Sequence, residues 1–482
     1  FRSKTRNFFI FIVVELILIG VIGARISNKS LSTNPDYVLI SWNDLGMHCT
    51  NIDFSKVVVL PPYNNLIAQV VKKGSATSLP QLVTSDLTLN YEIPGNTYSV
   101  GKTNFWSYED QLFGVNLPND TGLTGVGLSG TLTPSTDHFV VEGIPITPFT
   151  DSNLTTENPY QLALLSLYDT NGTLLATTQP VIPVSGEIGC VSNNCHPSQQ
   201  NILNEHDNVS GFNQNGPVLC ASCHSSNALG TTGQPGLESL SEVIHKEHDN
   251  TNNCYKCHPG SNTQCHRGVM NSVGFTCIDC HGDTENVGES ISNGREPWLD
   301  EPSCATSGCH TSIYAEEPGL LYRQSKGHGG LYCSACHGSP HAIFPSQQAN
   351  DNVQNIGLQG FAGTLSQCSV CHSITPNMPG PHGIVVTDIE TLANEASESR
   401  IDNIFPNPVS TQGTVEFSIA AHEHVSMEIF NVEGKVVLRL INRNMETGSY
   451  KISFAGDALK SGIYYLNIVT PSNKNSIKFI KI

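Results

Sequence analysis

The cysteines and histidines of this 482-residue chain follow a repeated pattern that could attach a cofactor. Five segments have the form Cys-x-x-Cys-His, and two more have the form Cys-x4-Cys-His. The seven pairs use 14 of the 16 cysteines, whereas chance would give about 0.02 copies of the shorter form at this composition. The pairs are Cys220 and Cys223, Cys254 and Cys257, Cys277 and Cys280, Cys333 and Cys336, Cys368 and Cys371, and, in the longer form, Cys190 and Cys195, and Cys304 and Cys309.

Cys-x-x-Cys-His is the attachment pattern of c-type haem. Two thiols one short turn apart can each bond one vinyl group of a porphyrin, and the next residue then lies beneath the iron as its proximal ligand. Zinc also binds paired cysteines, and a disulfide framework also uses them, but neither explains a histidine directly after all seven pairs. We therefore predict seven covalently bound haems c. The predicted proximal ligands are His196, His224, His258, His281, His310, His337 and His372.

Other histidines could supply the opposite axial ligand. Six in residues 185–385 are the main candidates, and His48 or His266 could be the seventh. A second imidazole on each iron saturates it, lowers its potential relative to Met ligation and favours electron transfer over substrate binding. The predicted distal ligands are His48, His206, His245, His248, His328, His341 and His382.

Two points of this ligand assignment stay open. His245 and His248 lie one helical turn apart, which leaves open that only one of them ligates. Met270 and Met378 are alternative axial ligands that we favour less than histidine.

Cys49 and Cys265 belong to no motif. In an exported protein, a leftover pair suggests a disulfide, here one joining the front of the chain to the motif-bearing region. The alternative is an eighth haem held by a single thioether at Cys265, with His266 as its ligand.

The chain starts with a basic stretch followed by a nearly unbroken apolar run from Phe8 to Ala24. This pattern predicts a secretory signal peptide over residues 1–26. A membrane anchor is the competing interpretation, because about 17 apolar residues is the lower limit for spanning a bilayer. Glu15 inside the run disfavours the anchor, and both interpretations predict export.

Composition divides the rest of the chain. Residues 35–184 contain strand-like runs and an Asn171-Gly172 pair between apolar runs, which predicts a hairpin in a β-rich domain. Residues 185–385 show little apolar periodicity. Seven haems in the 183 residues from Cys190 to His372 leave about 26 residues each, so porphyrin is expected to form the core. Residues 386–400 are a polar linker. Residues 401–482 contain six or seven short strands, which predicts a small Ig-like β-sandwich.

The net charge of the chain is −18, with 24 Lys and Arg against 42 Asp and Glu. Such an acidic balance argues against binding nucleic acid. Together these features predict a multidomain protein: an N-terminal β-rich domain, an irregular region of short helices with many haems, and a C-terminal β-sandwich.

Segments around the motifs resemble a known family. The run from Lys326 through Cys333-Ser-Ala-Cys336-His337 to His341 is similar to the repeated units of multihaem c-type cytochromes. The segment Trp42–Cys49 resembles the start of the β domain that accompanies such regions in some exported cytochromes. This resemblance implies a cytochrome c fold around the haems in residues 185–385.

The tail is similar to the type A sorting domain of the type IX secretion system. The matching residues are Phe405-Pro-Asn-Pro408, Phe430 to Gly434, Leu459 to Tyr464 and Lys478 to Lys481. The resemblance implies passage across the outer membrane, removal of the tail, attachment to the cell surface and a host of the Bacteroidota type.

The expected function is electron transfer along seven closely spaced, mostly bis-His haems to an extracellular acceptor or a partner cytochrome. The other expected partners are the secretion machinery and the outer cell surface, and copies of the chain could form a homo-oligomer or filament. One alternative is a multihaem oxidoreductase that reduces a small nitrogen or sulfur oxyanion at a haem with an open distal position. A surface adhesion protein that carries haems is the least favoured alternative. We expect a carrier rather than an enzyme.

Overall fold

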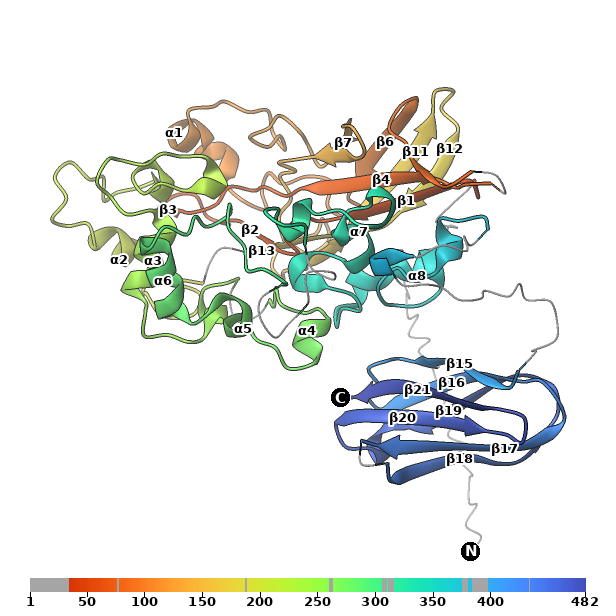
Figure 1. Ribbon diagram of the computed structural model, residues 1–482. Helices are drawn as coiled ribbons and strands as arrows, with labels where there is room; N and C mark the ends of the chain where they lie inside the picture. The colour runs from red at the N-terminus through yellow and green to blue at the C-terminus, as the bar shows by residue number, and fades with distance from the viewer. Residues whose placement is uncertain are drawn as a thin grey trace, which may run out of the picture.

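The computed structural model describes residues 34–75, 78–186, 189–259, 263–305, 310, 316–374, 380–383, 398–432 and 434–482 (Figure 1). The predicted signal peptide and most of the predicted linker lie outside the described residues. The described residues include no helix that is long and apolar enough to cross a membrane.

The front of the chain packs two antiparallel sheets face to face. One sheet has the order β1-β4-β9-β8 with β5 on β4, and the other has the order β12-β11-β6-β7. Alternate residues of β6 are buried, as expected for a strand with one face on a core. The strands are β1 (Tyr37–Trp42), β4 (Leu66–Lys72), β5 (Gln81–Leu82), β6 (Leu87–Glu92), β7 (Ser129–Thr131), β8 (Thr133–Pro134), β9 (Phe139–Val141), β11 (Leu164–Asp169) and β12 (Leu174–Thr178).

The predicted hairpin is present between β11 and β12. Gly172 has a φ of +79°, which a residue without a Cβ adopts at little cost. The Asp169 carboxylate accepts hydrogen bonds from the backbone N–H groups of Asn171 (2.9 Å) and Thr173 (2.8 Å) and so closes the turn.

Short strands connect this region to the rest of the chain. Strand β13 (Val181–Ser185) lies between β10 (Tyr160–Leu162) and β2 (His48–Cys49), and β3 (Val57–Val58) pairs in parallel with β14 (Val218–Leu219). The apolar run Val57–Leu60 forms a strand over its first two residues only, because the Asn51 side chain accepts the N–H groups of Val59 and Leu60 (2.9 and 3.0 Å).

The motif-bearing region is built from short helices, and its described part contains eight buried hydrophobic residues. Figure 1 shows these helices along one side of the sheets, from α2, α3 and α6 at one end to α7 and α8 near β1. The helices are α2 (Gln199–Asn204), α3 (Leu240–Glu247), α4 (Val269–Ser272), α5 (Cys277–His281), α6 (Thr284–Ser292), α7 (Cys333–His337) and α8 (Val353–Gln359); α1 (Glu109–Phe113) belongs to the front region.

The front and motif-bearing regions share their interiors. Ala335 and Val370, each between the two cysteines of a motif, pack in one cluster with Val38, Ile40 and Trp42. Gln354 Oε1 on α8 accepts hydrogen bonds from Ser41 N and from Thr178 Oγ1, both at 2.8 Å. The sheets are therefore part of the scaffold that holds the motifs.

A buried ion pair of the motif-bearing region also contacts the front region. Arg267 Nε and Nη2 donate to the Asp351 carboxylate at 2.7 and 2.8 Å, and Arg267 Nη1 donates to the Gly46 carbonyl at 2.6 Å. Both side chains are at most 4% exposed. Loss of one partner would leave the other charge buried without compensation.

We predict that Asp351→Asn lowers the free energy of unfolding by about 3–5 kcal/mol, the usual effect of breaking a buried pair. Denaturant titration followed by far-UV circular dichroism measures the change. Glu238→Gln, which removes one of the two carboxylates paired with the exposed Lys246, is the control and should leave the midpoint unchanged. A wild-type midpoint for Asp351→Asn would contradict the prediction.

The tail is a sandwich of two antiparallel sheets. One has the order β15-β16-β19 and the other β18-β17-β20-β21. These seven strands agree with the six or seven short strands that the sequence predicts for this part of the chain. The strands are β15 (Arg400–Phe405), β16 (Gln412–Ile419), β17 (Glu423–Asn431), β18 (Val436–Met445), β19 (Gly448–Ala455), β20 (Gly462–Val469) and β21 (Lys474–Lys481).

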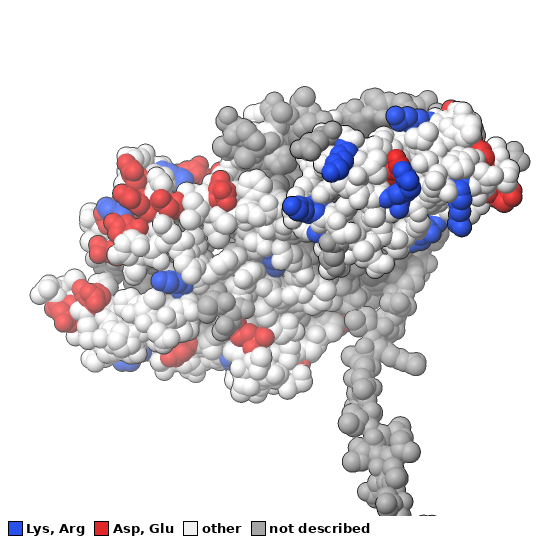
Figure 2. Space-filling model, turned by 90° about the horizontal axis from the view of Figure 1, so that it is seen from below, with Lys and Arg blue, Asp and Glu red and all other residues white. Residues whose placement is uncertain are grey.

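Charge is unevenly distributed along the chain. Residues 401–482 contain 8 Lys and Arg and 7 Asp and Glu, which is a net charge of +1 (8 − 7 = +1). Because the whole chain has a net charge of −18, residues 1–400 have a net charge of −19. Figure 2 shows basic side chains over the tail and acidic side chains gathered at the far end of the molecule. A cationic partner or surface would therefore be attracted to the part of the chain before the tail rather than to the tail.

Candidate functional site

Each described short motif folds into one tight turn. In the motif at Cys220, the N–H of His224 donates to the Cys220 carbonyl at 3.0 Å, and in the motif at Cys254 the N–H of His258 donates to the Cys254 carbonyl at 2.7 Å. The motifs at 277 and 333 form α5 and α7, which end on their histidines. The turn places the histidine and both thiols of a motif close together, as attachment of one cofactor requires.

The two longer motifs close in the same way. The N–H of His196 donates to the Cys190 carbonyl at 2.9 Å, and the N–H of His310 donates to the Cys304 carbonyl at 3.1 Å. The two additional residues therefore enlarge the loop but leave the histidine beside the first cysteine. Cys309 and residues 311–315 lie outside the described residues.

Six motif histidines each lie opposite a histidine from outside the motifs. The ring centroids are 5.9 to 6.5 Å apart in all six cases. The pairs are His196 with His248, His224 with His206, His258 with His245, His281 with His341, His372 with His328, and His337 with His382.

This separation fits two imidazoles on opposite sides of one metal ion. With metal–nitrogen bonds of about 2.0–2.1 Å and about 1.1 Å from each nitrogen to its ring centre, the two centroids would lie about 6.2–6.4 Å apart. Sequence spacing could not assign these pairs. Both His245 and His248 have a partner, and they have different ones.

Backbone carbonyls orient several of these rings. His245 Nδ1 donates to the Ser241 carbonyl (2.7 Å), and His248 Nδ1 donates to the Ile244 carbonyl (2.8 Å). His341 Nδ1 donates in the same way to Leu45 at 3.1 Å. A proton held on Nδ1 leaves the Nε2 lone pair free to bind a metal. Every residue has a backbone carbonyl, so residue types could not predict which carbonyls orient these rings. For His245 and His248, the accepting carbonyl belongs to the residue four positions earlier in the chain.

Burial favours the neutral form of two of the paired imidazoles, those of His258 and His341. It lowers the pKa of His258 to about 4, with smaller contributions from the neighbouring His245 and His281. Burial likewise lowers the pKa of His341 to about 4, with His281 adding to the effect. Neutral imidazole is the form that ligates metals, so these two rings are ready to bind at pH 7.

The two candidates for a seventh distal ligand are engaged elsewhere. His48 Nε2 donates to Asp44 Oδ1 at 2.7 Å, and its ring stacks on Tyr63 at 6.4 Å. His266 Nε2 donates to the Phe275 carbonyl at 3.1 Å. Neither ring is placed opposite a motif histidine in the described part of the chain. Met270 lies on α4, and Met378 lies outside the described residues.

The thiols of different motifs lie close to one another. Burial raises the pKa of Cys336 to about 12, and the charge of Cys371 adds to the rise. The Cys277 and Cys254 side chains are hydrogen bonded to each other. Burial raises the pKa of the Cys277 thiol to about 11, and the neighbouring Cys254 adds to the rise. In these two cases, the thiols of neighbouring motifs lie close enough to influence each other.

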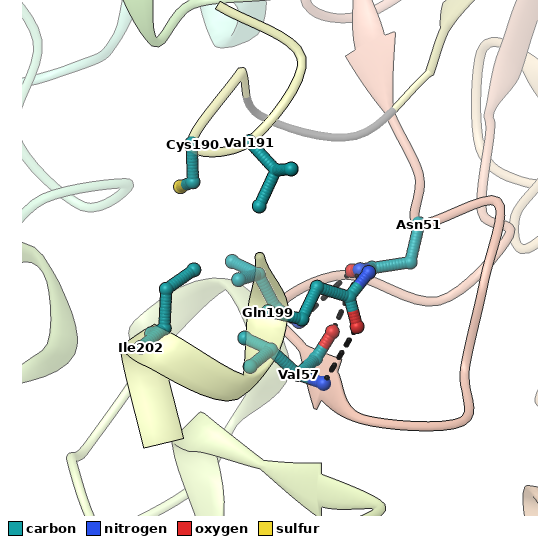
Figure 3. A pocket seen from close by; sticks show the side chains of 7 residues that line it. Asn51, Val57, Cys190, Val191, Gln199 and Ile202 are labelled. Atoms are coloured by element: carbon teal, nitrogen blue, oxygen red, sulfur yellow. Dashed lines mark hydrogen bonds between the residues drawn. The ribbon is translucent and has the colours of Figure 1, made fainter. Parts of the chain in front are cut away.

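A small pocket lies beside the first motif (Figure 3). Its apolar wall includes Val57, Val191 and Ile202, and the Cys190 side chain lies at its rim. Gln199 fixes one side of this pocket, because its Oε1 accepts the N–H of Val57 at 3.1 Å. The front strands thus form part of the surroundings of the first motif.

The arrangement suits a cofactor that brings its own metal. Each motif supplies two thiols and one imidazole, and a second imidazole faces the first across a gap of metal-complex size. Within the described ranges, no three His, Cys, Asp or Glu side chains are grouped to hold a bare metal ion. Haem c would use such donors, with the two thiols at the porphyrin edge and the two imidazoles at the iron.

Cys49 and Cys265, which belong to no motif, are brought together by the fold. Arg267 Nη1 donates to the carbonyls of Gly46 (2.6 Å) and Cys265 (2.9 Å), so the two segments meet at one guanidinium. Burial raises the pKa of the Cys49 thiol to about 12, and the charge of the neighbouring Cys265 adds to the rise.

We expect these two thiols to form a disulfide in the exported protein, with a disulfide oxidase of the cell envelope accepting the two electrons. Peptide mapping without reductant should find the two cysteines in one linked peptide, which reductant separates. The Cys49→Ser variant should instead show a free thiol at Cys265. An eighth haem on the Cys265 peptide would contradict this prediction.

Comparison with known proteins identifies the tail. Residues 403–482 match the family described as secretion system C-terminal sorting domain. The tail is therefore a type IX secretion sorting domain, and the chain is directed to the cell surface or secreted. No curated protein matches the chain.

Two solved structures from Porphyromonas gingivalis are similar in part. PorZ, described as an essential bacterial surface component of the type IX secretion system, is 18% identical over 17% of this chain and 11% of its own, with a TM-score of 0.13. Dimeric latent PorU is 10% identical over 93% of this chain and 34% of its own, with a TM-score of 0.15. The chain thus spans 11% and 34% of these two structures, and neither similarity assigns its function.

Proposed function

We propose that this protein is an exported multihaem c-type cytochrome that carries electrons at the cell surface, to an extracellular acceptor or a partner cytochrome. The observation that carries the proposal is the set of six pairs, each joining a histidine that follows a cysteine pair to a histidine from elsewhere at 5.9 to 6.5 Å. Six independent segments supply the same donor set, which a chance cluster of histidines would not do.

The residues of the chain have distinct roles in this proposal. Each thiol would add across one vinyl group: the S–H bond and the vinyl π bond break, a C–S bond forms, and the hydrogen passes to the other vinyl carbon, so no external oxidant or reductant is needed. The two imidazoles of a pair would both bind the iron and so exclude exogenous ligands. Haem iron, when bound, exchanges one electron between its ferric and ferrous states.

Apolar side chains around the motifs support the same proposal. Phe275 and Ile278, which flank Cys277, are 42% and 38% exposed. The eight buried hydrophobic residues of the motif-bearing region give it little core of its own. The apolar faces of porphyrins would cover such side chains and complete the core.

The sorting domain supports the proposed location. An electron carrier that serves an external acceptor must reach the outer surface, and the tail directs this chain there. The acidic body favours a cationic partner protein or a positively charged mineral or electrode surface as the acceptor.

Intact mass spectrometry of the mature protein tests the proposal, and we expect seven haem masses. The pyridine haemochrome assay should give the same number, and the EPR spectrum of the ferric protein should be mainly low spin. Absence of covalent haem would overturn the proposal. A stoichiometric high-spin signal with seven haems present would favour the oxidoreductase alternative instead.

A further inference from the structure

Helix α3 brings two motifs together that are not consecutive in the sequence. His245 on this helix lies 6.0 Å from His258 of the motif at Cys254, and His248 at its C-cap lies 6.1 Å from His196 of the motif at Cys190. The motif at Cys220 lies between these two in the sequence but has no ligand on α3. One helical turn of about 5 Å therefore separates the distal ligands of the first and third motifs.

The loops of the first and third motifs also touch directly. The N–H of Gly189 donates to the Cys257 carbonyl at 3.3 Å, and Asn193 Nδ2 donates to the Lys256 carbonyl at 2.7 Å. These two bonds and the shared helix are independent observations, and both place the first motif beside the third.

The second motif adjoins the first on its other side. His206, which faces His224 of the second motif at 6.5 Å, follows α2 only ten residues after His196 of the first motif. The Cys220 thiol is close enough to Cys190 for their charges to interact, which adds to the effect of burial in raising the Cys220 pKa to about 11.

We infer that the haem site at Cys190–His196 lies between the sites at Cys220–His224 and Cys254–His258, so that the spatial order begins second, first, third. This inference rests on the proposed function, because it concerns where the haems would be held. The Cys220 site is then a terminal site of the row, and the first motif in the sequence is an internal one.

The remaining sites follow the sequence. The Cys277 thiol neighbours Cys254, and the Cys304 thiol neighbours Cys280 and Cys333. The N–H of Leu365, three residues before Cys368, donates to the Cys336 carbonyl at 2.9 Å. The site at Cys368 is therefore the other end of the row, and it lies near β1 and β4 at the opposite end of the body from α2 and α3 (Figure 1).

Electron cryomicroscopy or anomalous X-ray scattering of the haem-loaded full chain tests the order directly. Of the irons held at the first two motifs, we expect that of the Cys190 haem to lie nearer to the iron of the Cys254 haem. An iron of the Cys220 haem in that position would overturn the inference. A chain without haem would overturn the proposed function as well, so the two failures are distinguishable.

A pair of tagged variants tests the order in solution. His248→Met and His206→Met each raise the potential of one haem, at the first and second motif respectively, and so make it distinguishable. Removal of the third haem by Cys254→Ser with Cys257→Ser should shift the midpoint potential of the His248→Met haem and leave that of the His206→Met haem unchanged.

The opposite pattern of shifts would contradict the inferred order. A haem count of six and unchanged low-spin EPR signals from the other sites show that the chain has folded. If removal of the third haem unfolds the chain, the His245→Met substitution is used instead of the two cysteine substitutions, because it keeps the third haem in place. The potentials of the His248→Met and His206→Met haems are then compared in the same way.

Discussion

A chain that ends at residue 397, without the tail, is expected to be absent from the cell surface in a host that has the type IX system. The tail matches a secretion sorting domain, and its seven strands form a sandwich with a core of their own. The secretion machinery would have no signal to recognise. Immunoblots of surface, periplasmic and medium fractions measure the effect, and we expect the surface and medium signal to be lost and the protein to remain in the periplasm.

A point substitution tests whether the tail must be folded to act as an export signal. Phe417 is 1% exposed in the tail core, and Phe417→Ala should destabilise the sandwich by about 3–5 kcal/mol and reduce export. Val432 is 68% exposed on the same sandwich, so Val432→Ser is the matched control and should be exported normally. Surface display of the truncated chain at the wild-type level would contradict the assignment of the tail as the export signal.

Substitution of His341 by Ala is expected to convert one iron of seven from low spin to high spin. His341 faces His281 at 6.2 Å, and its Nδ1 is held by the Leu45 carbonyl at 3.1 Å, so its Nε2 is directed to the opposite ring. Alanine removes the second axial ligand and leaves a five-coordinate iron. The EPR spectrum of the ferric protein should gain a high-spin signal equal to about one-seventh of the total haem.

Two further variants distinguish ligand loss from disturbed folding. His341→Met should restore six-coordination and low spin, with a higher potential at that haem. His138, which is hydrogen bonded to Asp137 and packs on the Tyr332 ring, faces no motif histidine, so His138→Ala should leave the spectrum unchanged. A low-spin spectrum of His341→Ala identical to the wild type would refute the assignment of His341 as an axial ligand.

Local patterns in the chain predicted local structure well. The Asn171-Gly172 pair marks the hairpin between β11 and β12, and strand alternation in the tail gives the strands of its sandwich. Turn chemistry and side-chain alternation depend on neighbours within a few residues, so they can be read along the chain. The run Val57–Leu60 was shorter as a strand than its residue types suggest, because the side chain of Asn51 takes the N–H groups that a longer ladder would use.

The extent of contact between the front and motif-bearing regions was not predictable from composition. A fall in cysteine content and apolar periodicity separates residues 35–184 from residues 185–385. In the fold, Gln354 reaches β1 and β12, and Arg267 reaches the Gly46 carbonyl. Such contacts join residues more than 170 positions apart, and no local pattern specifies them.

The sequence by itself determined the number and kind of the candidate sites and the destination of the chain. Seven cysteine pairs with a following histidine, and a tail with sorting-domain residues, are covalent and local features that hold in any conformation. Only the tertiary structure decided which histidine faces which motif, that both His245 and His248 have partners, and that Cys49 meets Cys265. Those pairings depend on how helices pack against sheets over long sequence separations, and the same residues could be paired differently in another fold.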